Sequence, residues 1–213
     1  MIKIERNENP KVDHYSSSLV QESLKKDFFK KCYICEEVTR HFEVDHFYPK
    51  SHYPHLLNEY KNLFYCCQKC NKIKPKVINT HSDNEILNCC DVDPSEYIKL
   101  KLNISECKVE VSQIKMNDTL EHQIKETIAL LNRVYNGENS QSTSCEDLKE
   151  EIKIKLVEFG QKLDKYQKTK LKNAISEAIR EELSLTASYT TFKRWIIRDN
   201  LALNETFGNY FEK

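Results

Sequence analysis

Four cysteines of this sequence are arranged in two pairs, each with two residues between the thiols. The pairs are Cys32-Tyr-Ile-Cys35 and Cys67-Gln-Lys-Cys70. Two intervening residues let one tight turn present both sulfurs to a single ion, and two such turns complete the tetrahedral shell that zinc prefers, at ~2.3 Å per sulfur. A closed shell of four sulfurs leaves no position for a reacting water. The sequence therefore predicts a structural zinc.

The other five cysteines lack this spacing. Cys66 adjoins the second pair, but only Cys67 has two residues between it and Cys70. Thiols stay reduced in the cytoplasm, where clustered cysteines indicate metal binding or catalysis rather than disulfides. We expect the remaining four to be reduced packing residues: Cys89, Cys90, Cys107 and Cys145.

Polar residues that bind metals or exchange protons are interleaved with the cysteine pairs. Asp45 and His46 are adjacent, Asn62 lies between the pairs, and Asn71 directly follows the last cysteine. An Asp-His pair alone is common on protein surfaces. The order of all these residues, taken together, is what indicates a functional site.

The segment that carries these residues, 32–76, contains three prolines, so long helices and strands are not expected there. Apolar and β-branched residues predict short strands over 41–46 and 63–66, and a short helix is expected over 68–74. So short a segment has little hydrophobic core, and a bound metal is a usual substitute for one.

Amphipathic patterns surround this segment. A helix is predicted over 14–31, and alternating residues predict a β-hairpin made of 97–103 and 107–113. After residue 117 the apolar residues recur at steps of three and four, and Asp118 with Glu121 has the form of a capping box. These patterns predict a bundle of four helices over 118–135, 144–166, 171–183 and 189–199.

The predicted fold class is α+β and mostly helical, in two parts. Residues 1–96 would hold an N-terminal helix and the zinc-stapled core, 32–76. Residues 97–213 would form the hairpin and the helical region, which we expect to pack and to dock a partner.

Composition excludes several classes of protein. The chain has 213 residues with 33 basic and 33 acidic side chains, and no apolar run approaches the ~18 residues of a membrane span. Its start is charged and lacks an apolar region, so we expect no secretory signal and a cytoplasmic location. Its three glycines all lie at or after Gly137, which excludes a P-loop and a dinucleotide fingerprint. Any ATP site must belong to a partner.

A run of basic residues lies around the predicted short helix. Residues 60–76 contain five lysines and no acidic residue, which suits sequence-independent contact with phosphates. A solvated lysine face is the alternative interpretation. The candidate nucleic-acid-binding residues are Lys61, Lys69, Lys72, Lys74 and Lys76.

The order Asp45-His46, Asn62-Leu63 and Cys67-x-x-Cys70-Asn71 resembles that of HNH nucleases, which have a ββα-metal fold. The resemblance covers about residues 32–76. In place of the family's usual third histidine this chain has Asn71, a variation expected to weaken metal binding without abolishing it.

The resemblance implies a role for each of these residues. His46 would act as general base, because a neutral imidazole can take a proton from water near pH 7. Asp45 and the side-chain oxygen of Asn71 would hold a catalytic Mg²⁺ or Mn²⁺. Asn62 would hold the intervening loop and orient His46.

A closer resemblance, over the N-terminal half, is to the HNH subunits of the Septu anti-phage system, which also occur beside some retrons. It rests on residues 1–6, 45–51 and 60–71. It implies an ABC/SMC-like ATPase as partner, the PtuA subunit, which would carry the nucleotide site. The sequence thus predicts a metal-dependent endonuclease, with DNA favoured as substrate. The alternatives are an RNA nuclease, including a tRNA nuclease of a retron-type toxin, and a catalytically silent zinc-ribbon module that binds nucleic acid.

Overall fold

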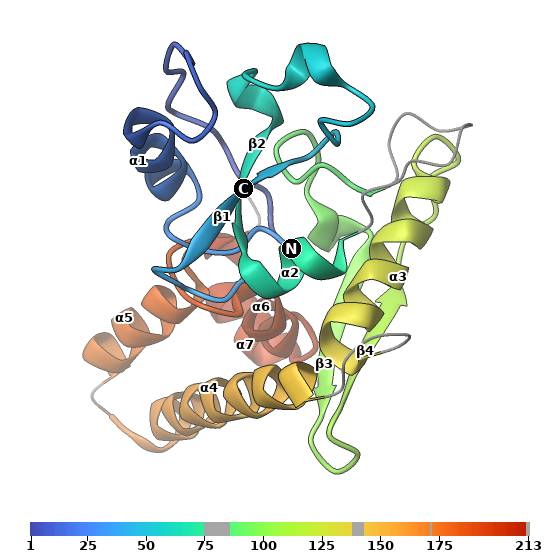
Figure 1. Cartoon of the computed structure of the whole chain (residues 1–213). Helices are drawn as coiled ribbons and strands as arrows, with labels where there is room; N and C mark the ends of the chain where they lie inside the picture. Colours follow the sequence, from blue (N-terminus) through green and yellow to red (C-terminus); the bar gives the residue numbers. More distant parts are fainter. Residues whose placement is uncertain (75–85, 138–142, 171, 212–213) are drawn as a thin grey trace.

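The computed structural model describes residues 1–74, 86–137, 143–170 and 172–211. The chain is mixed α+β, with more helix than strand, as predicted (Figure 1). The helices and strands of the described residues are α1 (Ser18–Asp27), β1 (Phe42–His46), β2 (Leu63–Cys67), α2 (Gln68–Ile73), β3 (Ile98–Asn103), β4 (Lys108–Gln113), α3 (Glu121–Asn136), α4 (Thr143–Lys168), α5 (Lys172–Leu183), α6 (Thr190–Arg198) and α7 (Leu201–Phe207).

The cysteine-rich segment folds into an antiparallel pair, β1 and β2, followed at once by α2. In the register, Asp45 is opposite Phe64 and His46 is opposite Leu63. Cys67 ends β2 and also caps α2, because its Sγ accepts the backbone N–H of Cys70. All residues of β2 are buried, in keeping with their aromatic and aliphatic character. The predicted strands and short helix are confirmed to within one residue.

The helix predicted over 14–31 is shorter in the structure. The side chain of Ser17 caps the first turn of α1 by accepting the backbone N–H of Val20. At the other end, Phe29 and Lys30 have positive φ angles of 54° and 58°, which a helix cannot contain. The chain thus turns sharply into the first cysteine pair.

The second sheet pairs β3 with β4 antiparallel, as the alternating pattern predicts. The helix α3 lies along β4, and Asn136 at its end both donates to and accepts from the backbone of Val109. The prediction that α3 joins the other helices in a four-helix bundle is wrong. The buried residues of α3 instead belong to the core that also contains the hairpin and the cysteine-rich segment. The second apolar cluster is formed by α4, α5, α6 and α7.

The predicted capping box at the start of α3 is also wrong. Asp118 does not cap the helix; the side chain of Asn117 instead accepts the backbone N–H groups of Thr119 and Leu120. The helix begins at Glu121, and Leu120 at the N-cap position makes no side-chain cap. The short side chain of Asn117 forms a local turn that competes with the box.

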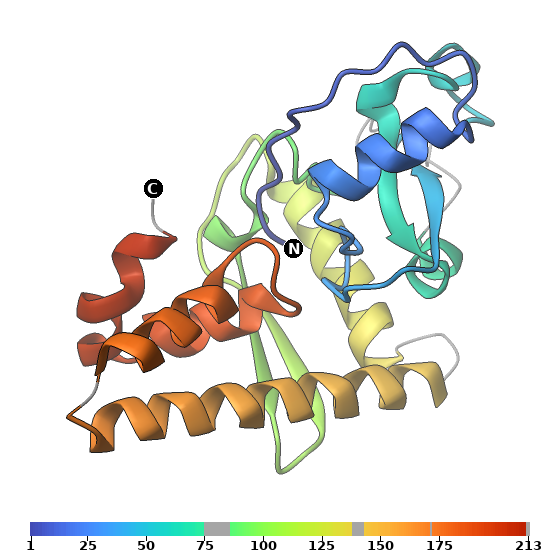
Figure 2. The ribbon, with the colours of Figure 1, turned by 90° about the vertical axis from the view of Figure 1, so that its left-hand side faces the viewer.

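The N-terminal residues join the two parts of the chain predicted from the sequence. Met1, Ile2 and Ile4 are buried in a single core that contains residues from both sides of residue 96. The segment then crosses to the cysteine-rich part (Figure 2). There the Arg6 guanidinium donates to the carbonyl oxygens of Tyr60 and Leu63 at 3.0 and 2.8 Å.

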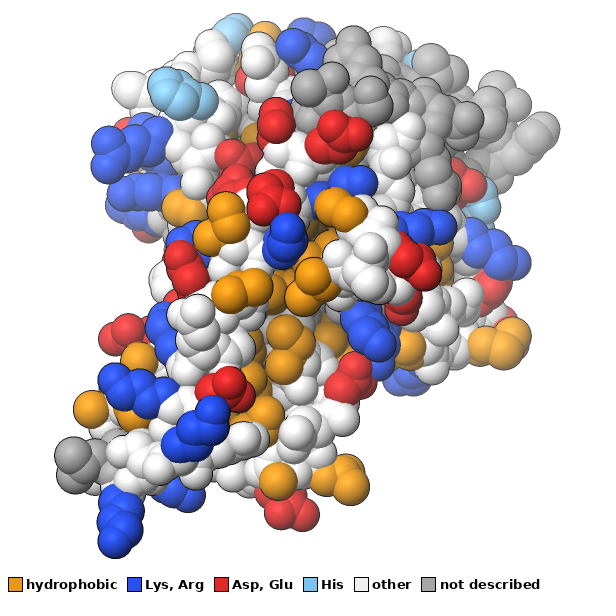
Figure 3. Space-filling model, turned by 90° about the horizontal axis from the view of Figure 1, so that it is seen from below, with side chains coloured by type: hydrophobic (Ala, Val, Ile, Leu, Met, Phe, Trp, Pro, Cys, Tyr) orange, Lys and Arg blue, Asp and Glu red, His pale blue; other side chains and the backbone are white. Residues whose placement is uncertain are grey.

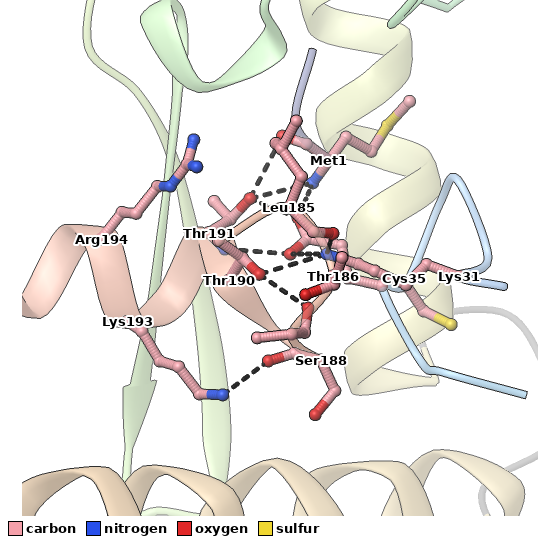
Figure 4. A network of polar contacts seen from close by, with 12 residues as sticks. Met1, Lys31, Cys35, Leu185, Thr186, Ser188, Thr190, Thr191, Lys193 and Arg194 are labelled. Atoms are coloured by element: carbon pink, nitrogen blue, oxygen red, sulfur yellow. Dashed lines mark hydrogen bonds and ion pairs between the residues drawn. The ribbon is translucent and has the colours of Figure 1, made fainter. Parts of the chain in front are cut away.

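A buried polar network fixes the start of the chain between the first cysteine pair and α6 (Figure 4). The ammonium of Met1 lies 2.8 Å from Oε1 of Glu36, and the backbone N–H of Thr191 donates to Oε2 at 2.9 Å. Lys31 lies 4.0 Å from Oε2 and donates to Thr190 and to the carbonyl of Leu185. Glu36 therefore neutralises two buried cations.

Replacing the carboxylate at the centre of this network should destabilise the whole fold. We expect Glu36→Gln to lower the free energy of unfolding by about 3–5 kcal/mol, because it leaves the Met1 ammonium and Lys31 buried without a counter-charge. Denaturant unfolding measures the change. The matched control is the half-buried neighbour Glu37→Gln, expected to change stability by less than about 0.5 kcal/mol.

The pH dependence of stability provides a second check. Burial raises the pKa of Glu36, but the Met1 ammonium and Lys31 outweigh it and hold the pKa at about 2, below its usual 4.5. The stabilisation by the charged carboxylate is therefore complete above about pH 4.5 and is lost as the pH falls towards 2. A difference between the wild type and Glu36→Gln that stays constant over this range would contradict the assignment.

Apolar surface remains on the C-terminal part. A cavity of about 560 Å³ lies between β3, α4 and α6, and its lining includes Leu100, Leu156, Phe192 and Trp195. On the face that is seen from below, hydrophobic side chains gather in a central hollow (Figure 3).

No helix in the described part of the chain is both long and apolar enough to cross a membrane.

Candidate functional site

The four predicted cysteine ligands converge. The sulfurs of Cys32, Cys35, Cys67 and Cys70 all lie within 4.8 Å of one another, and all four residues are buried. The Cys35 and Cys67 sulfurs are 3.8 Å apart, which is about the edge of a tetrahedron with Zn–S distances of ~2.3 Å. The cluster could therefore hold a zinc ion, as predicted, and Cys66 is not part of it.

Hydrogen bonds among the clustered thiols favour the ionised form of Cys32, whereas they raise the pKa of Cys35 and of Cys70 well above the usual value. Burial raises the pKa of the Cys32 thiol, but hydrogen bonds from the neighbouring thiols outweigh it and hold that pKa well below its usual value. The thiolate is the form that binds zinc. In the described residues, this is the one group of three or more His, Cys, Asp or Glu side chains whose ligand atoms converge in this way.

A separate cavity of about 330 Å³ lies where β1 ends. Its lining includes Asp45 and His46 from β1, Asn71 from α2, and Lys74 just beyond that helix. The structure thus brings together three of the four predicted catalytic residues. The fourth, Asn62, lies directly before β2 and lines another cavity of about 610 Å³.

The contacts of His46 indicate which ring nitrogen carries the proton when the imidazole is neutral. Its Nε2 atom lies 3.0 Å from the carbonyl oxygen of Leu57. A carbonyl oxygen only accepts hydrogen bonds, so Nε2 carries the proton and the lone pair of the neutral ring is on Nδ1. Burial lowers the pKa of His46, partly opposed by this hydrogen bond and by Asp45, which favours the neutral ring. The edge of the ring packs against Tyr15 at a centroid distance of 4.9 Å.

Asn62 ties together the loop that leaves β1. Its side-chain oxygen accepts the backbone N–H of Tyr48 at 2.7 Å, and its Nδ2 donates to the carbonyl oxygens of Tyr48 and Leu56 at 3.1 and 3.2 Å. Leu57, whose carbonyl meets His46, is the next residue of the same loop. Asn62 is therefore connected to the imidazole through the backbone of this loop.

Asp45 and Asn71 offer oxygen atoms that suit a hard divalent cation. Oδ2 of Asp45 accepts the Tyr33 hydroxyl at 2.8 Å and the Lys74 ammonium at 2.7 Å. Nδ2 of Asn71 donates to Glu43 at 2.5 Å, which leaves the amide oxygen as its acceptor. Mg²⁺ and Mn²⁺ prefer such carboxylate and amide oxygens, so the donor set fits the predicted cation.

The five candidate lysines differ in their environment. Lys61 and Lys72 are exposed and Lys69 is half-buried, so these three lie where a phosphate can reach them. Lys74 is only 7% exposed and its ammonium is directed at Asp45. Lys76 lies outside the described residues.

Sequence reasoning missed three contributors to this site, Glu43, Tyr33 and the carbonyl of Leu57, and it named Lys74 only as a phosphate contact. Glu43 is two residues before Asp45 on the same strand, so strand alternation could have placed both on one face. Tyr33 lies within a CxxC turn and Lys74 within a basic run, and neither pattern indicates a contact with Asp45. The carbonyl of Leu57 has no sequence signal at all.

Taken together, the fold and site define a mixed α+β protein in which a four-cysteine cluster that could bind zinc accompanies an Asp-His cavity. No protein-family model matches the chain, and no solved structure is significantly similar to it.

Two curated relatives, both PtuB proteins of the Septu system, are similar to part of this sequence. The Septu protein PtuB of Bacillus thuringiensis is 37% identical over 76 residues, which cover 33% of this chain and 28% of the relative. The Septu protein PtuB of Bacillus mycoides (strain KBAB4) is 30% identical over 118 residues, covering 41% of this chain and 40% of the relative. The matches therefore span less than half the length of either relative.

Proposed function

We propose that this chain is an HNH-type endonuclease that hydrolyses phosphodiester bonds, preferably in DNA, with Mg²⁺ or Mn²⁺ as catalytic cation. The observation that carries the proposal is one cavity lined by His46, whose lone pair is on Nδ1, together with Asp45 and Asn71. The four-cysteine centre next to it suits a structural zinc, because a closed shell of sulfurs leaves no position for water.

The proposed role in anti-phage defence is supported by the similarity to two PtuB proteins of the Septu system. A PtuA-like ABC/SMC-type ATPase is the corresponding partner. The chain contains no glycine-rich phosphate loop of its own, in keeping with a nucleotide site on another protein. The apolar hollow between β3, α4 and α6 belongs to residues 97–213, the part proposed to dock that partner.

In the proposed mechanism, Nδ1 of His46 takes a proton from the attacking water. The ring is suited to this because its Nε2–H is fixed by the Leu57 carbonyl and its pKa is lowered by burial. Asn62 keeps this carbonyl in place through its hydrogen bonds across the loop. Asp45 and Asn71 would hold the divalent cation, which supplies positive charge to stabilise the phosphate as it reacts.

The proposal is tested with the chain purified alone and together with the ATPase encoded beside it. Supercoiled plasmid and total RNA are incubated with Mg²⁺, with Mn²⁺ or with EDTA, and products are resolved on gels. Nicked or linear DNA that requires the cation is the expected result. Cleavage of RNA alone would identify an RNA nuclease instead. Binding to either substrate without turnover under every condition would favour the zinc-ribbon binding module.

The exposed lysines of the candidate patch should contribute to substrate affinity. We expect Lys61→Gln with Lys72→Gln to raise the Kd for DNA and to lower the slope of log Kd against log salt concentration by about 2, because each substitution leaves one phosphate without its neutralising cation. Fluorescence anisotropy across a salt series measures both. The control pair, Lys153→Gln with Lys155→Gln, removes two lysines of α4, and an equal change of slope there would contradict the patch.

A further inference from the structure

Lys74 is the one lysine of the candidate patch that is buried in the described residues. Its ammonium lies 2.7 Å from Oδ2 of Asp45, 2.9 Å from the carbonyl oxygen of His46 and 3.2 Å from that of Phe47. A lysine ammonium has three protons, and three acceptors surround this one. Lys74 therefore has no proton left for a phosphate.

The aromatic surroundings hold the same ammonium in place. It lies 5.9 Å from the centre of the Tyr33 ring and 5.4 Å from that of the Phe47 ring, both within the range of cation–π attraction. The Tyr33 hydroxyl in turn donates to Oδ2 of Asp45 at 2.8 Å. Lys74 and Tyr33 thus hold the same carboxylate oxygen from two sides.

These two residues come from the two halves of the four-cysteine centre. Tyr33 lies between Cys32 and Cys35, in the first CxxC turn. Lys74 is the C-cap of α2, which begins just after Cys67, and its backbone N–H donates to the carbonyl of Cys70 at 2.8 Å. A rigid metal centre would therefore fix the positions of both residues relative to β1.

The consequence for Asp45 is a fixed orientation. Oδ2 receives two donors, whereas within the described part of the chain no hydrogen bond reaches Oδ1 of this residue. Lys74 also holds the carbonyls of His46 and Phe47, and so fixes the backbone from which the imidazole projects.

We propose that Tyr33 and Lys74 form a clamp that transmits the geometry of the four-cysteine centre to Asp45 and His46. Both are positioning residues, and Lys74 is not a phosphate contact. This inference rests on the proposed nuclease function. It assigns the CxxC turns a role in catalysis beyond stabilising the fold, because each contributes one donor to the carboxylate beside the imidazole.

The test compares Lys74→Met, Tyr33→Phe and Lys72→Met in steady-state cleavage of DNA with Mg²⁺. Partners that orient the groups around a metal site typically contribute about 10–100-fold to activity. We expect Lys74→Met to lower kcat by ~100-fold and Tyr33→Phe by ~10-fold, while KM for DNA and its salt dependence change by less than about twofold. Lys72→Met, two residues away and exposed, should show the opposite pattern: a higher KM, a smaller salt slope and the same kcat.

The outcomes separate the clamp from other roles. A higher KM and a smaller salt slope for Lys74→Met, with kcat retained, would make it a phosphate contact and overturn the inference. Lys74→Met can fail to fold, since it leaves Asp45 buried without a counter-charge. The zinc content and far-UV circular dichroism reveal this, and Tyr33→Phe, which changes no charge, then decides. A kcat within twofold of the wild type for Tyr33→Phe overturns the clamp, whereas a wild type without any cation-dependent cleavage overturns the nuclease proposal itself.

Discussion

His46→Ala should lower the rate of cation-dependent DNA cleavage by ~10²–10⁴-fold, the usual contribution of a general base. The substitution removes the only atom proposed to accept the proton of the attacking water, Nδ1 of this ring. The residue is 9% exposed and lines the cavity at the end of β1, so the loss of its ring opens space without exposing a large apolar surface. Single-turnover cleavage of a labelled duplex, at saturating protein, measures the change in the chemical step.

Two controls make this result specific. His52→Ala removes an exposed imidazole six residues away, whose Nδ1 meets the neighbouring Ser51 hydroxyl, and it should leave the rate within about twofold of the wild type. Zinc content and affinity for DNA should stay unchanged in His46→Ala. Cleavage by His46→Ala at the wild-type rate would rule out this residue as the base.

The local elements and the convergence of the four cysteines could be predicted from the sequence, because the signals that define them lie close together in the chain. Two residues between thiols fix the geometry of a turn, and Cys67 is distinguished from Cys66 by that spacing alone. Short runs of aromatic and β-branched residues predict the two strands, one before and one after Asn62. Such local structure can be predicted because it depends on residues that are adjacent in the chain and not on distant contacts.

The environment of Lys74 and the packing of α3 could not be predicted, because distant residues decide them. A lysine in a basic run looks solvent-exposed, and only the approach of Asp45, 29 positions earlier, makes its burial possible. Likewise, the apolar stripe of α3 shows that one face is buried but does not show against what. In the structure that face meets β4 and the first cysteine pair, where the Tyr135 hydroxyl donates to the carbonyl of Cys35.

Cys67→Ala should remove bound zinc and destabilise the entire chain. The four sulfurs lie in the main core, which also contains the N-terminal residues and the hairpin of β3 and β4. Structural zinc contributes about 10–16 kcal/mol of binding free energy in small metal domains, comparable to the whole stability of a typical domain. We expect a fall of more than ~10 °C in Tm, measured by calorimetry, together with loss of zinc in elemental analysis.

The neighbour Cys66 provides the matched control. It is equally buried and its sulfur lies 4.0 Å from that of Cys32, yet it is outside the converging group. Cys66→Ala should therefore keep a full complement of zinc and lower stability by only the ~1 kcal/mol expected for a small cavity. If Cys67→Ala retained zinc and Cys66→Ala lost it, Cys66 rather than Cys67 would be the zinc ligand. A wild-type protein that contains no zinc, and whose Tm does not change with a chelator, would mean that these thiols are held together by packing alone.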